Sequence, residues 1–163
     1  MNVKAVQDFY PDDLSYCYGC GRLNEHGHQI KSFWEGDEIE NPGLGRTVAR
    51  FTPKSYHIAI PGYVYGGLIA SLIDCHGTGT AALASYRNEG RDPGTEPAFR
   101  FVTASLQVDY LKPTPLGVEL ELRGKIIELK GRKVVSEITV SANNEITAKG
   151  RVVAVQMPEN FIK

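Results

Sequence analysis

The sequence has no long apolar run, almost no net charge and few cysteines, and each of these absences removes a class of protein. No run approaches the roughly 18 apolar residues that span a membrane, and residues 1–8 lack the apolar core of a secretory signal. A formal net charge of −1 gives no reason to expect nucleic acid or an anionic membrane as a partner. Three cysteines are an odd number and too few for a disulfide framework. We therefore expect a cytoplasmic protein that binds neither nucleic acid nor a membrane.

The chain of 163 residues has the length of one domain with its own core, and it contains no internal repeat. Residues 1–29 are polar and rich in turn-forming residues, so we expect an irregular N-terminal segment. Alternating side chains predict strands at 30–39 and 45–52, with a turn at 40–43 between them. Prolines and glycine in residues 53–65 then predict a loop.

One long helix is predicted over residues 66–86. Apolar side chains recur there at helical spacing, as Leu68 and Leu72 illustrate. Gly77 and Gly79 lie in the same stretch, and each costs a helix about 1 kcal/mol relative to alanine. Because small residues let another backbone come close, we expect this helix to pack tightly against a sheet.

The chain after residue 97 has the alternation of β-strands. Strands are predicted at residues 98–111, 118–123, 134–140 and 145–157. In the first of them, even-numbered residues from Val102 to Tyr110 are expected on one face and Thr103 on the other. Turns at 130–132 and 143–144 are short, which implies antiparallel neighbours. The predicted order is β-β-α-β-β-β-β, an α+β fold with one helix covering one face of the sheet.

The start of the predicted helix carries the most chemical information. Gly66 and Gly67 open it, and the first N–H groups of a helix are free to bind an oxygen that becomes negative. Asp74 follows eight residues after Gly66, in an otherwise apolar run where a carboxylate is costly to bury. Together these residues indicate an acyl-transfer site.

Two motifs resemble those of a known family. The segment Tyr65–Asp74 is similar to the His-Gly-Gly…Asp signature of the phenylacetate-pathway (PaaI-like) acyl-CoA thioesterases. The segment Thr103–Pro113 resembles their next strand, which a Ser or Thr begins and Tyr-x-x-Pro closes. Cys17–Gly21 resembles a Cys-x-x-Cys-Gly segment of many members. The resemblance covers roughly residues 15–157. It implies a hotdog fold, in which a long antiparallel sheet wraps a central helix, and hydrolysis of an acyl-CoA without a metal or redox cofactor.

The resemblance also implies roles for individual residues. Gly66 and Gly67 supply backbone N–H groups to the thioester oxygen, and Asp74 activates water or attacks directly. Thr103 takes the place of the Ser or Thr that orients the water. Tyr65 departs from the pattern, because a His is usual there. A tyrosine hydroxyl can donate a similar hydrogen bond, but it does not titrate near neutral pH.

The spacing of the motif predicts a site between subunits. Eight residues along a helix separate Gly66 from Asp74 by about 12 Å. One reacting carbon cannot lie about 3 Å from both. If both take part in one reaction they come from different chains, so we expect at least a homodimer, with dimer and dimer of dimers left open. His57, in the loop before the helix, is a further candidate that lines the mouth of this site.

Other interpretations stay open at this point. Asp74 is also compatible with a structural role in the helix, and Thr103 with that of an ordinary β-former. Tyr65 in place of a His keeps open a second alternative, a non-catalytic protein that binds acyl-CoA. A hotdog enoyl-CoA hydratase is the third alternative; it needs an Asp–His pair, for which His57 and His76 are the candidates.

The N-terminal cysteines allow a metal interpretation as well. Cys17 and Cys20, with His26 and His28, offer four ligands of the kind that zinc prefers. The interval from Cys to His is much shorter than in zinc fingers, so we favour a loop with free thiols and no metal. Cys75 adjoins Asp74, and we expect it to be a small core residue.

Overall fold

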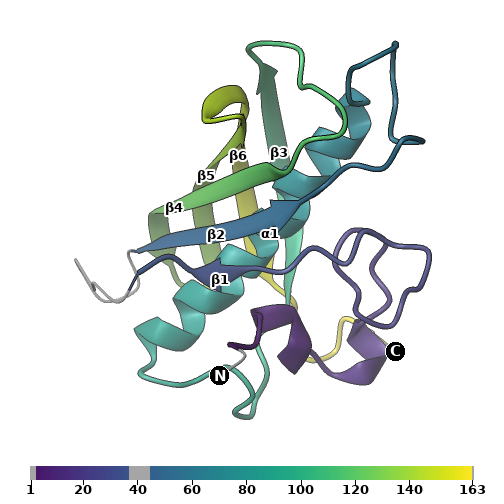
Figure 1. The fold of residues 1–163 in the computed structure, drawn as a ribbon. Helices are drawn as coiled ribbons and strands as arrows, with labels where there is room; N and C mark the ends of the chain where they lie inside the picture. The colour runs from purple at the N-terminus through teal and green to yellow at the C-terminus, as the bar shows by residue number, and fades with distance from the viewer. Residues whose placement is uncertain (1–2, 37–44, 163) are drawn as a thin grey trace.

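A six-stranded antiparallel sheet curves along one helix in the computed structural model, which describes residues 3–36 and 45–162 (Figure 1). The strands are β1 (Phe33–Trp34), β2 (Arg46–Phe51), β3 (Phe101–Tyr110), β4 (Leu120–Lys130), β5 (Lys133–Ala142) and β6 (Glu145–Gln156). The helix α1 spans Gly66–Asn88, and two short 3₁₀ helices, η1 (Val6–Phe9) and η2 (Asp12–Leu14), lie in the N-terminal segment. This arrangement confirms the predicted α+β hotdog fold.

The strands follow the order β1-β2-β4-β5-β6-β3, and every neighbouring pair is antiparallel. The predicted turns are confirmed, because two residues connect β4 to β5 and two connect β5 to β6. Asn143 and Asn144 both have positive φ (51° and 62°), which suits the right-handed twist of a tight hairpin. This order leaves β3 at one edge of the sheet, beside β6 alone.

Several predicted boundaries are wrong. The first strand is only Phe33–Trp34 within the described residues; the predicted residues 37–39 and the turn at 40–43 lie outside them. Ile30, expected in this strand, is instead buried in the core before it begins. The strand predicted at 118–123 runs from Leu120 to Lys130. The strand continues through Gly124, which passes so close to Thr80 of α1 that a Cβ there would lie 3.0 Å from the threonine hydroxyl.

The predicted alternation of β3 is also incorrect. A β-bulge interrupts its pairing with β6 between Thr103 and Ser105. Such a bulge shifts the faces of the residues on either side of it, so a single period of two does not hold along the strand. Most of β3 is exposed beyond Phe101, in contrast to the buried positions that alternate along β4, β5 and β6.

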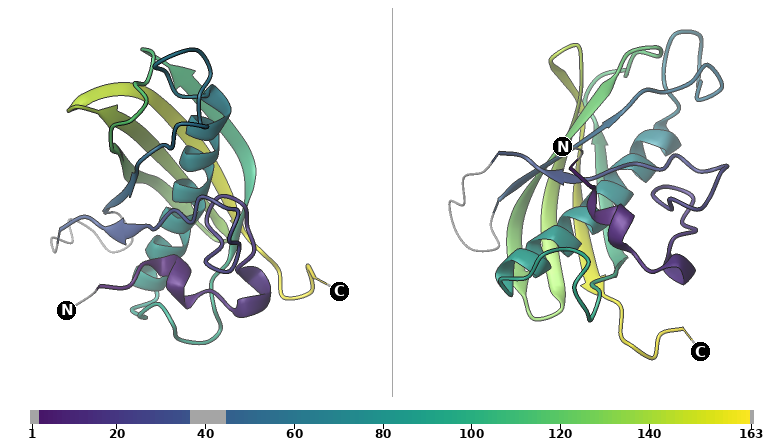
Figure 2. Two further views of the ribbon diagram at one scale, coloured as in Figure 1. Left: turned by 45° about the vertical axis from the view of Figure 1, so that its right-hand side comes forward. Right: turned by 60° about the horizontal axis from the view of Figure 1, so that its bottom comes forward.

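The helix α1 is buried on two sides, by different parts of the chain. Figure 2 shows the sheet along one side and the N-terminal segment against the helix as well. A Cβ on Gly77 would lie 2.6 Å from Val152 of β6, which confirms tight packing against the sheet. A Cβ on Gly79 would lie 2.6 Å from the side chain of Gln7 instead. The N-terminal segment therefore covers the part of the helix that the sheet does not reach.

His76 lies at the centre of these contacts. Its Nδ1 is 2.8 Å from the Ser32 hydroxyl and its Nε2 is 3.2 Å from the Thr47 hydroxyl, which in turn bonds Thr80. The ring is fully buried, and burial lowers its pKa from 6.5 to about 4, so the imidazole is neutral at pH 7. Within the described residues, no helix is long and apolar enough to cross a membrane.

Candidate active site

The helix starts where the glycines predicted it, and its first N–H groups are free. Tyr65 is the N-cap residue, and no side chain bonds this end of the helix. The hydrogen bonds found across the described residues include none from the N–H groups of Gly66 or Gly67. The preceding loop is held in place, because Tyr65 N–H donates to the His57 carbonyl (2.9 Å) and Val64 N–H to Thr114 (2.9 Å). Two backbone donors therefore stand in a fixed position.

Two tyrosine rings border these glycines. The Tyr110 hydroxyl, from the end of β3, donates to the Gly66 carbonyl (2.7 Å). The ring of Tyr65 lies over Gly67 so closely that a side chain on that residue would collide with it. Partial burial, with a smaller effect from Tyr65, raises the pKa of Tyr110. Beside them is a cleft of about 320 Å³ with Gly66, Ile69 and Tyr110 in its lining, large enough for a small acyl group or part of a larger one.

Asp74 and Thr103 meet across the helix and the sheet edge. Asp74 is half-buried on α1, and the exposed Thr103 of β3 donates its hydroxyl hydrogen bond to the Asp74 carboxylate. The structure thus brings together two residues that the sequence named from different motifs. A carboxylate held by one hydroxyl keeps further lone pairs for a water molecule, so it is equipped to accept a proton.

The two halves of the candidate site do not meet within one chain. Gly66 lies beside Tyr110, at one end of β3, whereas Asp74 lies beside Thr103, near the other. Since α1 begins at Gly66, the predicted separation of about 12 Å along the helix stands. Both halves border the same exposed edge strand.

His57 takes a different position from the other candidates. Its Nδ1 accepts a hydrogen bond from the Lys54 N–H (2.9 Å), and its ring packs against His28 and Phe51. Burial and then the nearby Lys54 lower its pKa. The ring is therefore engaged within its own loop, and only its backbone carbonyl reaches Tyr65.

No histidine among the described residues bonds Asp74. His57 is engaged as above, and His76 is enclosed between Ser32 and Thr47. The Asp–His pair that an enoyl-CoA hydratase needs is not formed within the chain. The structure gives that alternative no support.

The free thiols expected for the N-terminal loop are observed, and they lie together with Cys75. The Sγ atoms of Cys17, Cys20 and Cys75 all lie within 4.8 Å of one another. His26 is not part of this group, as its side chain is 84% exposed, and His28 stacks on Tyr18. The proposed Cys/His ligand set is therefore not formed. Cys75 is a buried core residue, as predicted, and its Sγ also contacts that of Cys17. No spacing in the sequence signals this contact, because Cys75 is 55 residues beyond Cys20.

Sequence reasoning also missed the bond from Tyr110 to Gly66. The Tyr-x-x-Pro ending of β3 was the available signal, but it says nothing about which backbone group the hydroxyl meets. That contact ties the end of β3 to the first turn of α1.

A hotdog fold with free N–H groups at its helix start and a carboxylate–hydroxyl pair two turns further along the same helix is an arrangement suited to processing thioesters. The sequence profile described as the Thioesterase superfamily matches residues 61–154, more than half of the chain. The chain belongs to this superfamily.

Individual relatives differ in their sequence identity to this chain and in how much of it they cover. A solved Thioesterase superfamily protein from Shewanella loihica PV-4 is 50% identical, covers 91% of this chain and all of its own, and superposes with a TM-score of 0.65. Acyl-coenzyme A thioesterase THEM4 is 33% identical in Xenopus laevis over 64% of this chain, and 32% identical in Mus musculus over 72%. The chain spans less than half the length of these curated relatives, with 41% and 47% of them covered.

The finer resemblance to PaaI-like enzymes is supported at the level of the fold. A mutant of phenylacetic acid degradation protein PaaI from Thermus thermophilus is 21% identical over 78% of this chain and 93% of its own, with a TM-score of 0.56. Identity at that level shows a shared fold. What stands is membership of the Thioesterase superfamily and a distant relation to THEM4.

Proposed function

We propose that this chain is an acyl-CoA thioesterase that hydrolyses its substrate to a free acid and CoA. The observation that carries the proposal is the hydrogen bond from Thr103 to Asp74. It places a carboxylate and a hydroxyl together at the sheet edge, on the same helix whose first N–H groups are free. Membership of the superfamily and the distant relation to THEM4 support the reaction class and the acyl-CoA substrate.

The reaction follows from the charges that develop. Backbone N–H groups of Gly66 and Gly67 donate to the thioester carbonyl oxygen, which becomes negative in the transition state; one such donor is typically worth several kcal/mol. Asp74 takes a proton from water as the water oxygen bonds to the carbonyl carbon, or attacks that carbon itself. Thr103 orients the reacting group. The carbon–sulfur bond then breaks, and CoA leaves as a thiolate. If Asp74 was the attacking group, water then hydrolyses the mixed anhydride that it formed, which releases the free acid and restores the carboxylate.

We further propose a homodimer formed through β3. This strand is an unpaired edge on which Leu106 and Tyr110 are 39% and 54% exposed, and such an edge invites pairing with another chain. A two-fold axis between Leu106 and Gln107 pairs the strands antiparallel and sets Thr103 opposite Tyr110 of the partner subunit. Because Thr103 bonds Asp74 and Tyr110 bonds Gly66, that pairing brings the carboxylate of one chain to the N–H donors of the other.

Placement among the PaaI-like enzymes is a finer proposal. It rests on the Tyr65–Asp74 and Thr103–Pro113 motifs, and it leaves the acyl group to experiment. Tyr65 at the usual His position keeps one rival in view, a protein that binds acyl-CoA without hydrolysing it.

The test compares wild type with Asp74→Asn across short, long, aromatic and branched acyl-CoAs, with release of free thiol as the readout. Loss of the base is expected to lower kcat about 10²–10⁴-fold, while calorimetry shows retained acyl-CoA binding. Asp92→Asn is the matched control, since Asp92 is an exposed acid in the loop after α1 and lies outside β3. Undiminished turnover by Asp74→Asn would defeat the assignment. Binding without turnover by the wild type would favour the non-catalytic rival.

A further inference from the structure

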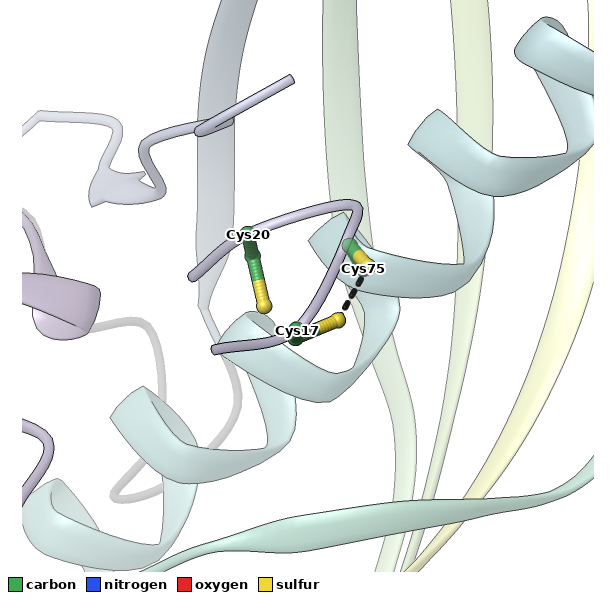
Figure 3. A group of neighbouring side chains, drawn as sticks. All are labelled: Cys17, Cys20 and Cys75. Carbon is green, nitrogen blue, oxygen red and sulfur yellow. Dashed lines mark hydrogen bonds between the residues drawn. The ribbon is translucent and has the colours of Figure 1, made fainter. Parts of the chain in front are cut away.

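The three cysteines of the chain converge at one place that the proposed reaction does not use. Cys17 and Cys20 come from the N-terminal loop and Cys75 from α1, with the side chains of Cys17 and Cys75 directed toward each other (Figure 3). All three are free thiols, and Cys20 and Cys75 are buried. All three cysteines of the sequence therefore lie together, although Cys75 is 55 residues beyond Cys20.

The spacing of the sulfur atoms matches that of a metal site. Zinc binds thiolate sulfur at about 2.3 Å in a tetrahedron, which sets neighbouring sulfur atoms about 3.8 Å apart. The Sγ atoms of Cys17 and Cys75 are 3.8 Å apart, and no pair in the group exceeds 4.8 Å. The three thiols therefore surround a common point without rearrangement of the fold.

The loop that carries two of the thiols is held by its own hydrogen bonds. Gly21 N–H donates to the Cys17 carbonyl (2.7 Å), and Ile30 N–H donates to the Gly19 carbonyl (3.1 Å). Gly19 passes so close to the Cys75 sulfur that any side chain there would collide with it. The backbone of this loop has no room to move toward α1, so the two thiols that it carries are already held in position. Metal binding then costs little conformational entropy.

The surroundings suit a cluster with negative charge. Arg100 is close enough to interact with the charges of the three cysteines, and its guanidinium is 4.6 Å from the Tyr10 ring centroid. Tyr10 is 3% exposed, yet within the described part of the chain its hydroxyl has no hydrogen-bond partner. Tyr10 belongs to the same buried cluster as Cys20 and Cys75, so a cation and an unused donor border the part of the core that holds the thiols.

We propose that Cys17, Cys20 and Cys75 form a binding site for one zinc ion, which ties the N-terminal loop to α1 one residue after Asp74. Three thiolates and one Zn²⁺ leave a single negative charge, which Arg100 offsets. The described residues place no fourth Cys, His, Asp or Glu in the group, so water that enters beside half-exposed Cys17 completes the coordination. The proposal is independent of the thioesterase assignment, because the ion takes no part in the reaction.

The full chain is purified without chelator and its zinc content measured, and the apoprotein is then titrated with Zn²⁺ and with Co²⁺. The expected result is one metal ion per chain and an intense near-ultraviolet thiolate-to-cobalt absorption band. Cys17→Ser is expected to lose that band and its zinc. His26→Ala and His28→Ala are matched controls that keep both, since neither imidazole belongs to the group. Zinc is also expected to raise the thermal midpoint of the wild type and not that of Cys17→Ser.

Direct titration of the wild type keeps the test decisive if a cysteine variant misfolds. Absence of stoichiometric zinc and of the cobalt band in the folded, reduced wild type overturns the proposal. So does a Cys17–Cys75 disulfide in protein purified without reductant, if the reduced form then fails to take up zinc. Loss of metal from His26→Ala or His28→Ala would overturn the three-thiolate ligand set.

Discussion

Two polar side chains that lie two residues apart on α1, Asp74 and His76, differ in what surrounds them. His76 is fully buried, and both of its ring nitrogens have partners, Ser32 and Thr47. Asp74, two residues earlier, has one partner, the exposed Thr103, at an open edge of the sheet. A buried group whose hydrogen bonds are all satisfied stabilises one structure. A carboxylate with lone pairs left at an accessible edge can react. The difference lies in what covers each side chain and not in the residue types.

The largest expected effect concerns the other part of the candidate site, the free N–H groups at the start of α1. Gly66→Pro removes the proposed N–H donor and is tolerated by the helix, because proline is favoured at the first helical position and Tyr65 already has a compatible backbone (φ −59°, ψ 127°). We expect kcat to fall about 10²–10³-fold with unchanged circular dichroism. Gly66→Ala is the control that keeps the N–H. Equal losses in both variants would assign the effect to shape and not to the donor.

The same variant tests whether the site is shared between subunits. In a mixed dimer of Gly66→Pro and Asp74→Asn chains, one site keeps both an intact donor and an intact carboxylate. Random reassortment is then expected to restore about a quarter of wild-type activity. Activity that stays at the level of the separate variants would place donor and carboxylate in independent sites.

Breaking the closed cluster, which consists of His76 with Ser32 and Thr47, should lower the stability of the fold and leave turnover unchanged. His76→Ala leaves a buried cavity and removes one of the hydrogen-bond partners of each of the Ser32 and Thr47 hydroxyls, so we expect the free energy of unfolding to fall by about 3 kcal/mol in urea titrations. The kcat of the folded fraction should remain close to wild type. His57→Ala, in a partly exposed loop, is the control, with an expected loss below about 1 kcal/mol. A large fall in kcat of folded His76→Ala would contradict the separation of the two clusters.

The closed cluster should also set an acid limit on stability. Burial lowers the pKa of His76 from 6.5 to about 4. Between these values the unfolded chain binds a proton that the folded chain does not, so stability falls as the pH drops through this window. The full loss is about 3 kcal/mol. Because the pKa values of His28 and His57 are lowered too, the difference between wild type and His76→Ala isolates this residue. A difference that does not change with pH between 6.5 and 4 would contradict the assignment.

Local sequence signals were enough to name the residues of the candidate site. The glycine pair predicted where α1 begins, and the two motifs named Asp74 and Thr103. Their meeting follows from the resemblance, because helix and strand take fixed places in that fold. The register of β3 was not predictable, since nothing in an alternating run marks a bulge.

The closed cluster and the cysteine group depend on contacts between distant segments. Ser32 reaches His76 only because the N-terminal segment crosses the helix, and the sequence shows that segment merely as polar and irregular. Cys75 joins Cys17 in the same way. Periodicity describes one element at a time, so it does not indicate which segment covers the far side of a helix.

The smallest expected effect concerns Tyr65, the N-cap residue at the exposed start of α1. Its ring packs over Gly67, and its side chain is 58% exposed. Tyr65→Phe keeps the packing and removes only the hydroxyl, so a hydrogen bond to substrate appears as a fall in kcat/KM of about tenfold or less. Tyr65→His introduces a group with an ordinary pKa near 6.5, and activity should then acquire a pH dependence in that range that wild type lacks. Full activity of Tyr65→Phe, with no new pH dependence in Tyr65→His, would mean that the ring serves only to hold the glycines in place.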